Sequence, residues 1–110
     1  MKVNVLGTEY EILKQAKEDN PKLEDNVGLC EHYSKEIILS DLKEEKDHVM
    51  CVENIEDFEK KTLRHEIIHA FLGESGLRGS SEWAENEEMV DWFAIQAPKL
   101  FEAFKNTDCL

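Results

Sequence analysis

The spacing of apolar residues changes near Asn54, and this change limits the chain to one broad fold class. Before Asn54, short segments alternate apolar and polar side chains with the period of a β-strand, as in VNV at 3–5 and YEI at 10–12. After it, apolar residues recur every three or four positions, which is the period of an α-helix. Strands followed by helices predict an α+β fold.

Two β-hairpins are predicted before the change of period. The first turns at Gly7 and Thr8, between the two alternating segments just described. The second joins residues 28–33 to residues 35–40 at Ser34. Hairpins are local and antiparallel, so they predict a small antiparallel sheet that packs on the later helices. No element is predicted for residues 41–53.

A central helix is predicted at about residues 55–72. Asn54 is a suitable N-cap, acidic residues occupy the first turn, and Gly73 offers a stop at the other end. On a helical wheel, His65 and His69 fall in one sector of about 60° together with apolar side chains. Both histidines are therefore expected on an apolar face.

Two further helices are predicted after a loop rich in glycine and serine. One covers about 82–96 with Ser81 as its cap, and the other covers about 98–105 because Pro98 suits a first helical turn. The apolar stripe of the last helix is predicted to lie in the core, and it consists of Leu100, Phe101 and Phe104.

A chain of 110 residues predicts one domain, 1–110, with its strands at about 2–40. The net charge of −12 repels phosphate backbones and anionic membrane surfaces, so neither nucleic acid nor membrane is expected as a partner. An acidic decoy that imitates DNA is a minority alternative. The opening MKVNVLGTEY alternates where a signal peptide needs a continuous apolar stretch, and the three cysteines lack CxxC spacing. A cytoplasmic location is therefore expected.

The segment RHEIIH at 64–69 contains the HExxH arrangement. His65 and His69 are four residues apart, which places both imidazoles on one side of a helix, close enough to share a metal ion. Glu66 lies beside them on the wheel without competing for the ion. It can accept a proton from zinc-bound water, so we predict Glu66 as the catalytic base.

A third ligand is predicted on the helix at 82–96. Glu87 is the one acid within an apolar sector whose other members are Trp83, Val90 and Ala94. A carboxylate in such a place needs a cation beside it, which is either a zinc ion or, alternatively, a lysine or arginine at the edge of the core. Asp91 lies one turn later on the same face. We predict that it accepts a hydrogen bond from a ligand histidine, for which we choose His65.

HEIIH followed by NEEMVD at 86–91 resembles the HExxH and NExxxD pattern of gluzincins, the thermolysin-like zinc metallopeptidases. The longer stretches around both motifs resemble the small uncharacterised zincin domains encoded by phages and mobile elements. The resemblance implies a zincin-like fold, a zinc cofactor held by His65, His69 and Glu87, and a peptide or protein substrate. It also implies that an edge strand, for which we take residues 35–40, holds the substrate by strand addition.

The chain departs from this family in one respect. Thermolysin-like enzymes carry a separate histidine or tyrosine that stabilises the oxyanion, and no motif here identifies one. The candidates are chosen by residue type alone, and they are His32, Tyr33, His48 and Arg78.

Three hypotheses follow. The first is a zinc metallopeptidase, in which Glu66 assists the attack of zinc-bound water on an amide bond. The second is a non-catalytic acidic module that zinc stabilises and that binds a protein partner. In the third, HExxH is accidental and the chain is a plain α+β interaction domain.

Overall fold

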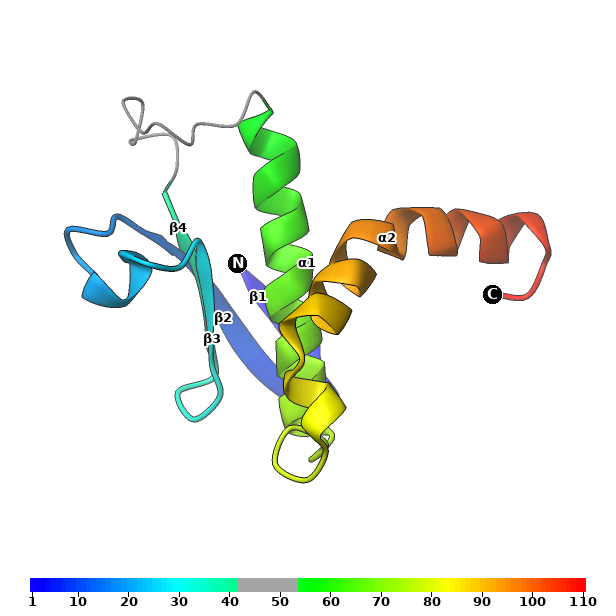
Figure 1. Cartoon of the computed structure of the whole chain (residues 1–110), viewed down its shortest axis with the longest axis horizontal. Coiled ribbons are helices and arrows are strands. Elements are labelled where there is room, and N and C mark those ends of the chain that lie inside the picture. Colours follow the sequence, from blue (N-terminus) through cyan, green and yellow to red (C-terminus); the bar gives the residue numbers. More distant parts are fainter. Residues whose placement is uncertain (42–53) are drawn as a thin grey trace.

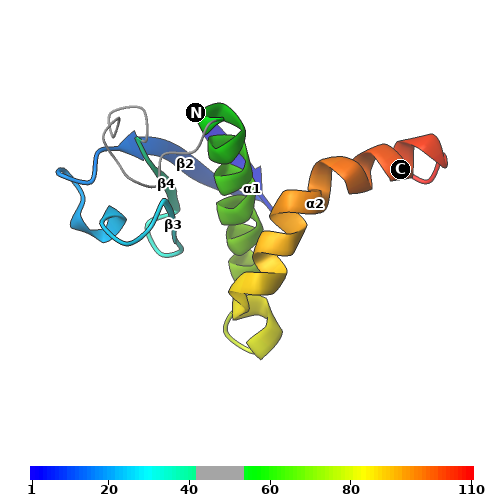
Figure 2. The ribbon, with the colours of Figure 1, turned by 45° about the horizontal axis from the view of Figure 1, so that its top comes forward.

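The computed structural model describes residues 1–41 and 54–110, and it confirms the predicted α+β class (Figure 1). Helix α1 lies between a four-stranded sheet and helix α2, so the chain forms three layers (Figures 1 and 2). In chain order the elements are β1 (Lys2–Val5), β2 (Thr8–Gln15), the 3₁₀ turn η1 (Pro21–Leu23), β3 (Gly28–Glu31), β4 (Glu36–Ser40), α1 (Ile55–Glu74), the 3₁₀ turn η3 (Glu82–Glu85) and α2 (Glu87–Asn106).

The sheet is mixed, so the prediction of a wholly antiparallel sheet is wrong. Its strand order is β1-β2-β4-β3, and both predicted hairpins are present as antiparallel pairs. The two hairpins join through β2 and β4, which pair in parallel with Ile12 opposite Ile37. Each of these is the second strand of its hairpin, so side-by-side hairpins bring them together in the same direction. Sequence patterns show each hairpin but not how two hairpins meet.

Both hairpin turns differ slightly from the predicted positions. The first lies at Leu6 and Gly7, which have positive φ angles of 52° and 92°, and Thr8 already belongs to β2. A two-residue turn of this kind needs positive φ at both positions, and Asn4 supports it by accepting a hydrogen bond from the Gly7 N–H at 2.9 Å. The second turn comprises residues 32–35, so His32 lies outside the strand where it was expected.

The principal core lies between the sheet and α1. Five side chains form it, each of them 5% exposed or less, and they are Val5, Tyr10, Ile37, Leu39 and Ala70. Strand β4 is the most buried strand because it lies inside the sheet, which explains the consecutive apolar residues in its sequence. Packing against this core gives α1 its fixed position beneath β3 and β4.

Helix α1 begins and ends close to the predicted residues. Asn54 is the N-cap, and its side chain accepts a hydrogen bond from the Asp57 N–H at 3.2 Å. The helix continues past Gly73 to Glu74, so the predicted stop is early by two residues, a common discrepancy at helix ends.

Glu74 fixes the end of α1 to the sheet. Its carboxylate accepts hydrogen bonds from the hydroxyls of Thr8 (3.1 Å) and Tyr10 (2.7 Å) and from the Lys35 ammonium (2.7 Å). The bonds from Lys35 and Tyr10 lower the pKa of Glu74 to about 2, so the carboxylate is ionised at neutral pH. Residues from both hairpins therefore meet on one helical side chain.

Helix α2 is a single helix from Glu87 to Asn106, so the predicted break before Pro98 is wrong. A proline inside a helix lacks the N–H that would bond to the carbonyl four residues earlier, here that of Ala94. The side chain of Arg64 on α1 replaces this donor, with its Nε 2.6 Å from the Ala94 oxygen. The helix changes direction along its length, as expected at an interior proline (Figure 1).

The second half of α2 extends away from the other layers (Figure 2). Phe101 is 53% exposed and Phe104 is 40% exposed, so the prediction that this stripe lies in the core is wrong. None of the described helices has the length and apolar character that a bilayer span requires.

Candidate metal centre

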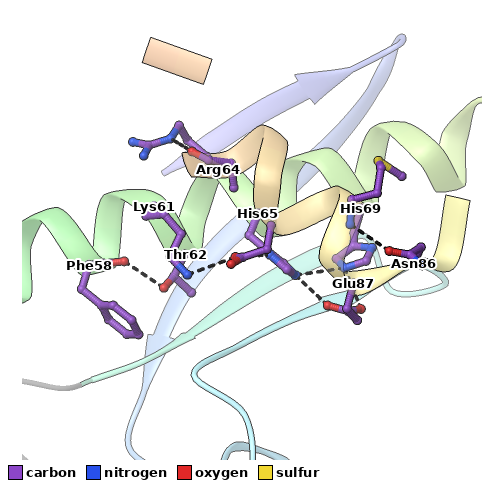
Figure 3. A network of polar contacts seen from close by, with 11 residues as sticks. Phe58, Lys61, Thr62, Arg64, His65, His69, Asn86 and Glu87 are labelled. Atoms are coloured by element: carbon purple, nitrogen blue, oxygen red, sulfur yellow. Dashed lines mark hydrogen bonds and ion pairs between the residues drawn. The ribbon is translucent and has the colours of Figure 1, made fainter. Parts of the chain in front are cut away.

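Helices α1 and α2 bring His65, His69 and Glu87 together (Figure 3). The His65 Nε2 lies 2.9 Å from one oxygen of Glu87, and the His69 Nε2 lies 3.0 Å from the other. The two Nε2 atoms are 3.1 Å apart. The three side chains predicted as ligands therefore converge on one point, although they come from two helices.

A second carboxylate orients the His65 ring. The Nδ1 of His65 lies 3.1 Å from an oxygen of Asp91, one turn after Glu87 on α2. An ionised carboxylate only accepts, so Nδ1 carries the proton and Nε2 presents a lone pair. Burial opposes ionisation of Asp91, but hydrogen bonds from Lys61 and His65 lower its pKa. Asp91 thus makes the contact that was predicted for it.

This arrangement fits a bound cation. The His65 Nε2 lone pair faces a Glu87 oxygen, so two acceptors approach within 2.9 Å and need a proton or a metal ion between them. Burial lowers the pKa of His69, which favours the neutral imidazole that a metal needs. Two imidazoles and one carboxylate are a ligand set of catalytic zinc, whose tetrahedron has edges of roughly 3.3 Å.

Glu87 reaches this point from the start of its helix, whereas the sequence placed it in the interior of a helix at 82–96. It is the first residue of α2, at the end of the expected apolar stripe and not within it: Val90 and Ala94 are buried as expected, but the Glu87 side chain is 71% exposed. Trp83, the first member of that stripe, lies in η3 instead. Among residues 1–41 and 54–110, no lysine or arginine forms an ion pair with Glu87, whose ion-pair partners are the two histidines. The alternative of a basic partner is therefore not realised in the described chain.

Glu66 lies beside the three converging side chains but outside their group. It is 7% exposed, and burial raises its pKa to about 7 despite the opposing influence of His65. Strand β3 passes directly over it, because a Cβ at Gly28 would come within 3.1 Å of the Glu66 carboxylate. A glycine at the start of β3 is thus required for the strand to approach this carboxylate.

A cavity of about 290 Å³ opens next to these residues. Helix α1 contributes His65, Glu66 and His69 to its lining, and η3 and Glu87 at the start of α2 line it as well. Residues of β3 form a further wall. The converging nitrogen and oxygen atoms therefore face this cavity.

Strand β3, not β4, is the edge strand next to this cavity. β4 is paired on both sides, so the expectation that residues 35–40 form the substrate-binding edge is wrong. The Ser40 N–H donates to the Val27 oxygen, and hydrogen-bonded pairs alternate in an antiparallel ladder. Gly28 and Cys30 consequently direct their backbone N–H and C=O groups away from β4.

The four residues considered for oxyanion stabilisation lie in different places, and only two of them line the cavity. Tyr33 is 99% exposed in the second hairpin turn, and His48 lies outside the described residues. His32 and Arg78 both line the cavity. The His32 ring packs against Gly73 on α1, where any Cβ would overlap it. No spacing in the sequence identified these two residues, because the β3–β4 turn and the loop after α1 meet only in the folded chain.

Compared with protein-family models, with curated proteins and with solved structures, the chain has no significant match. Its relation to the gluzincins stays a resemblance of two short motifs. The geometry of the site is therefore the basis for any proposal about function.

Proposed function

We propose that this chain is a zinc-dependent peptidase that hydrolyses peptide bonds. One observation carries the proposal: His65, His69 and Glu87 present three donor atoms about 3 Å apart beside the buried carboxylate of Glu66. His65, His69 and Glu87 would hold the ion. A bound zinc ion supplies a Lewis acid that polarises the substrate carbonyl and lowers the pKa of water to about 7.

Glu66 is proposed as the proton carrier of the reaction. A carboxylate whose pKa lies near 7 accepts a proton from the attacking water and then donates it to the leaving amine at neutral pH. Its burial against Gly28 holds the carboxylate in one place and excludes bulk solvent from that side. Asp91 keeps the lone pair of His65 directed toward the site throughout.

The free edge of β3 is proposed to bind the substrate. The backbone groups of Gly28 and Cys30 are available for an extended peptide, which adds to the sheet as a further strand. Because Gly28 touches Glu66, a peptide on this edge passes directly beside the proposed proton carrier. Backbone binding of this kind tolerates many side chains.

A non-catalytic module that zinc stabilises is the second candidate. Ala84, Val90 and Ala94 are the fully buried apolar residues of η3 and α2, so the interface of these elements with α1 is small. An ion held by residues from both helices would strengthen this interface. The peptidase proposal differs from this one in requiring Glu66.

Substitution of Glu66 separates the two candidates. The Glu66→Gln protein and wild type are loaded with zinc and incubated with a cell-derived peptide library, and new peptide ends are identified by mass spectrometry. Under the peptidase proposal the variant keeps zinc affinity within about threefold but cleaves at least about 100-fold more slowly. Glu56→Gln, an exposed change on the same helix, is the matched control and leaves cleavage unchanged.

The remaining outcomes are also informative. Equal cleavage by wild type and Glu66→Gln would contradict the role of Glu66. Zinc binding without cleavage in either protein would support the module. Less than about 0.1 zinc per chain after titration would exclude both candidates.

A further inference from the structure

One end of the cavity carries a positive charge in a strongly acidic chain. Arg78 is the single lysine or arginine among the described residues that line the cavity, whereas Glu66, Glu85 and Glu87 line it as well. The whole sequence has 25 acidic and 13 basic residues. Because the other charged residues of the lining are acidic, a single arginine among them suggests a binding site for a negatively charged ligand.

Arg78 makes no ion pair within residues 1–41 and 54–110. Two other basic residues, Lys35 and Lys61, each form an ion pair with a carboxylate of the chain. The Arg78 guanidinium therefore keeps five N–H donors for another molecule, in the planar arrangement that matches a carboxylate.

The backbone fixes where this side chain starts. Gly76 has a positive φ of 84°, which turns the chain back at the end of α1. The Arg78 N–H then donates to the Leu72 oxygen at 3.1 Å, so the residue is tied to the last turn of the helix. Arg78 lines the same cavity as His32 and His69, and its charge, after burial, helps to lower the pKa of His32.

His32, which lines the cavity with Arg78, lies about two helical turns from Glu66 along α1. Strand β3 starts beside Glu66 at Gly28, and the turn after it places His32 against Gly73. Seven helical residues separate Glu66 from Gly73, or about 10 Å. This distance equals about three residues of an extended peptide. A substrate lying along β3 consequently passes His32 and Arg78 within about three residues of the bond that is cleaved.

We propose that Arg78, together with His32, forms a subsite for a substrate carboxylate within three residues of the scissile bond. This inference rests on the proposed peptidase function. Two groups of a peptide supply a carboxylate: an Asp or Glu side chain, and a free C-terminus. Antiparallel addition to β3 places residues on the amino-terminal side of the bond near Arg78, which requires a side chain. Parallel addition places the carboxyl-terminal side there, where either group fits.

Peptide binding tests the subsite without relying on catalysis. Fluorescein-labelled alanine- and serine-containing hexapeptides carry Glu or Gln at one position in turn, each with a free or an amidated C-terminus. Fluorescence anisotropy is measured with the metal-free wild type and with zinc-loaded Glu66→Gln protein. We expect one carboxylate position to bind about 5- to 10-fold more tightly than its neutral counterpart. Preference for Glu or for the free C-terminus then identifies which group is recognised.

The variants attribute this preference to Arg78. Arg78→Gln should reduce the preference to within about twofold while binding of neutral peptides is unchanged. Arg78→Lys should retain part of it, because an ammonium keeps the charge but not the planar fork. Lys99→Gln removes an equal charge from the exposed half of α2 and should leave the preference intact.

Two results would overturn the subsite. One is a wild-type protein that binds charged and neutral peptides equally. The other is an Arg78→Gln protein that loses affinity for both kinds alike. Selective binding without hydrolysis of any peptide by the zinc-loaded wild type would instead contradict the proposed function and leave the subsite in place.

Discussion

The two halves of α2 both expose large apolar side chains, but only the first half also has fully buried ones. In the first half, Val90 and Ala94 are fully buried against the rest of the chain, and Glu87 contacts both histidines of α1. In the second half, Phe101 and Phe104 are exposed to solvent. An apolar stripe thus shows that a helix can be amphipathic, but it does not show that a partner is present. Both residues that α2 contributes to the candidate metal centre, Glu87 and Asp91, lie in the half that packs against α1.

The boundary between the halves has a physical cause. Pro98 removes one hydrogen bond from the helix and bends it, so the later turns leave the surface of α1. Arg64 compensates by donating to the Ala94 carbonyl at the bend. The bend limits the α1–α2 interface to roughly the first three turns of α2, which is where Glu87 and Asp91 are located.

The largest difference between the halves is expected in metal affinity. Replacing Glu87 with Ala removes one of the three proposed ligands and should weaken zinc binding by more than about 100-fold, since even partners of metal ligands contribute 10- to 100-fold. Glu102→Ala, an exposed acid in the second half, should change affinity by less than about twofold. Competition with a chromophoric chelator measures both. Equal affinities for the two variants would show that Glu87 is not a ligand.

A smaller loss is expected for Asp91→Asn. The amide cannot accept as strongly from the His65 Nδ1–H, and it can turn its own N–H₂ toward the ring, so the lone pair at Nε2 is held less firmly. Zinc affinity should fall by about 10- to 100-fold, again measured by chelator competition. Asp108→Asn after the end of α2 is the matched control. An unchanged zinc affinity in Asp91→Asn would show that Asp91 does not support zinc binding.

Local sequence signals predicted the parts of the site that depend on one helix. The spacing of His65 and His69, the N-cap at Asn54 and the hairpins are short-range features, and each is present in the structure. The reason given for Glu87 was only partly right, because Val90 and Ala94 are buried on its helix, but Trp83 lies in a 3₁₀ turn and the Glu87 side chain is exposed. The NExxxD spacing, which the resemblance supplied, was the better indicator.

Long-range features were not predictable from one sequence. The parallel pairing of β2 with β4 depends on how two hairpins dock, and the identity of the edge strand follows from it. The continuity of α2 through Pro98 involves Arg64, which lies more than thirty positions earlier in the chain. Its side chain donates to the Ala94 carbonyl that the proline leaves without its helical partner. Gly28 is a weak sequence signal for the contact between β3 and Glu66, since a glycine in a strand often marks a place where another group approaches the backbone closely.

Substitutions in the two halves of α2 should also differ in their effect on the free energy of unfolding. Val90→Ala deletes two buried methyl groups in the first half and should lower the free energy of unfolding by about 1.5–2.5 kcal/mol. Urea denaturation of the metal-free protein, followed by circular dichroism, measures this loss. A change below about 0.5 kcal/mol, the range of surface substitutions, would mean that α2 does not pack on α1 as described.

The attachment of α1 to the sheet should be sensitive to acid, in a way that the second half of α2 is not. The pKa of Glu74 is lowered from 4.5 to about 2, so its contribution to stability is complete above pH 4.5 and is lost as the pH falls toward 2. Wild type should therefore exceed Glu74→Gln in urea midpoint at pH 7, and the difference should shrink between pH 4.5 and 2. A difference that is independent of pH would contradict the role of the ionised carboxylate. Glu102→Gln should show no such difference.

The smallest effect is expected for polar substitutions in the second half of α2. Phe101→Ser and Phe104→Ser replace side chains that are already 53% and 40% exposed, so each should change the free energy of unfolding by less than about 0.5 kcal/mol. Zinc affinity should stay within about twofold, because neither residue lies near the candidate centre. Urea denaturation and chelator competition provide both values. A loss near that of Val90→Ala would mean that the second half packs against a surface in solution, and the contrast between the two halves would no longer hold.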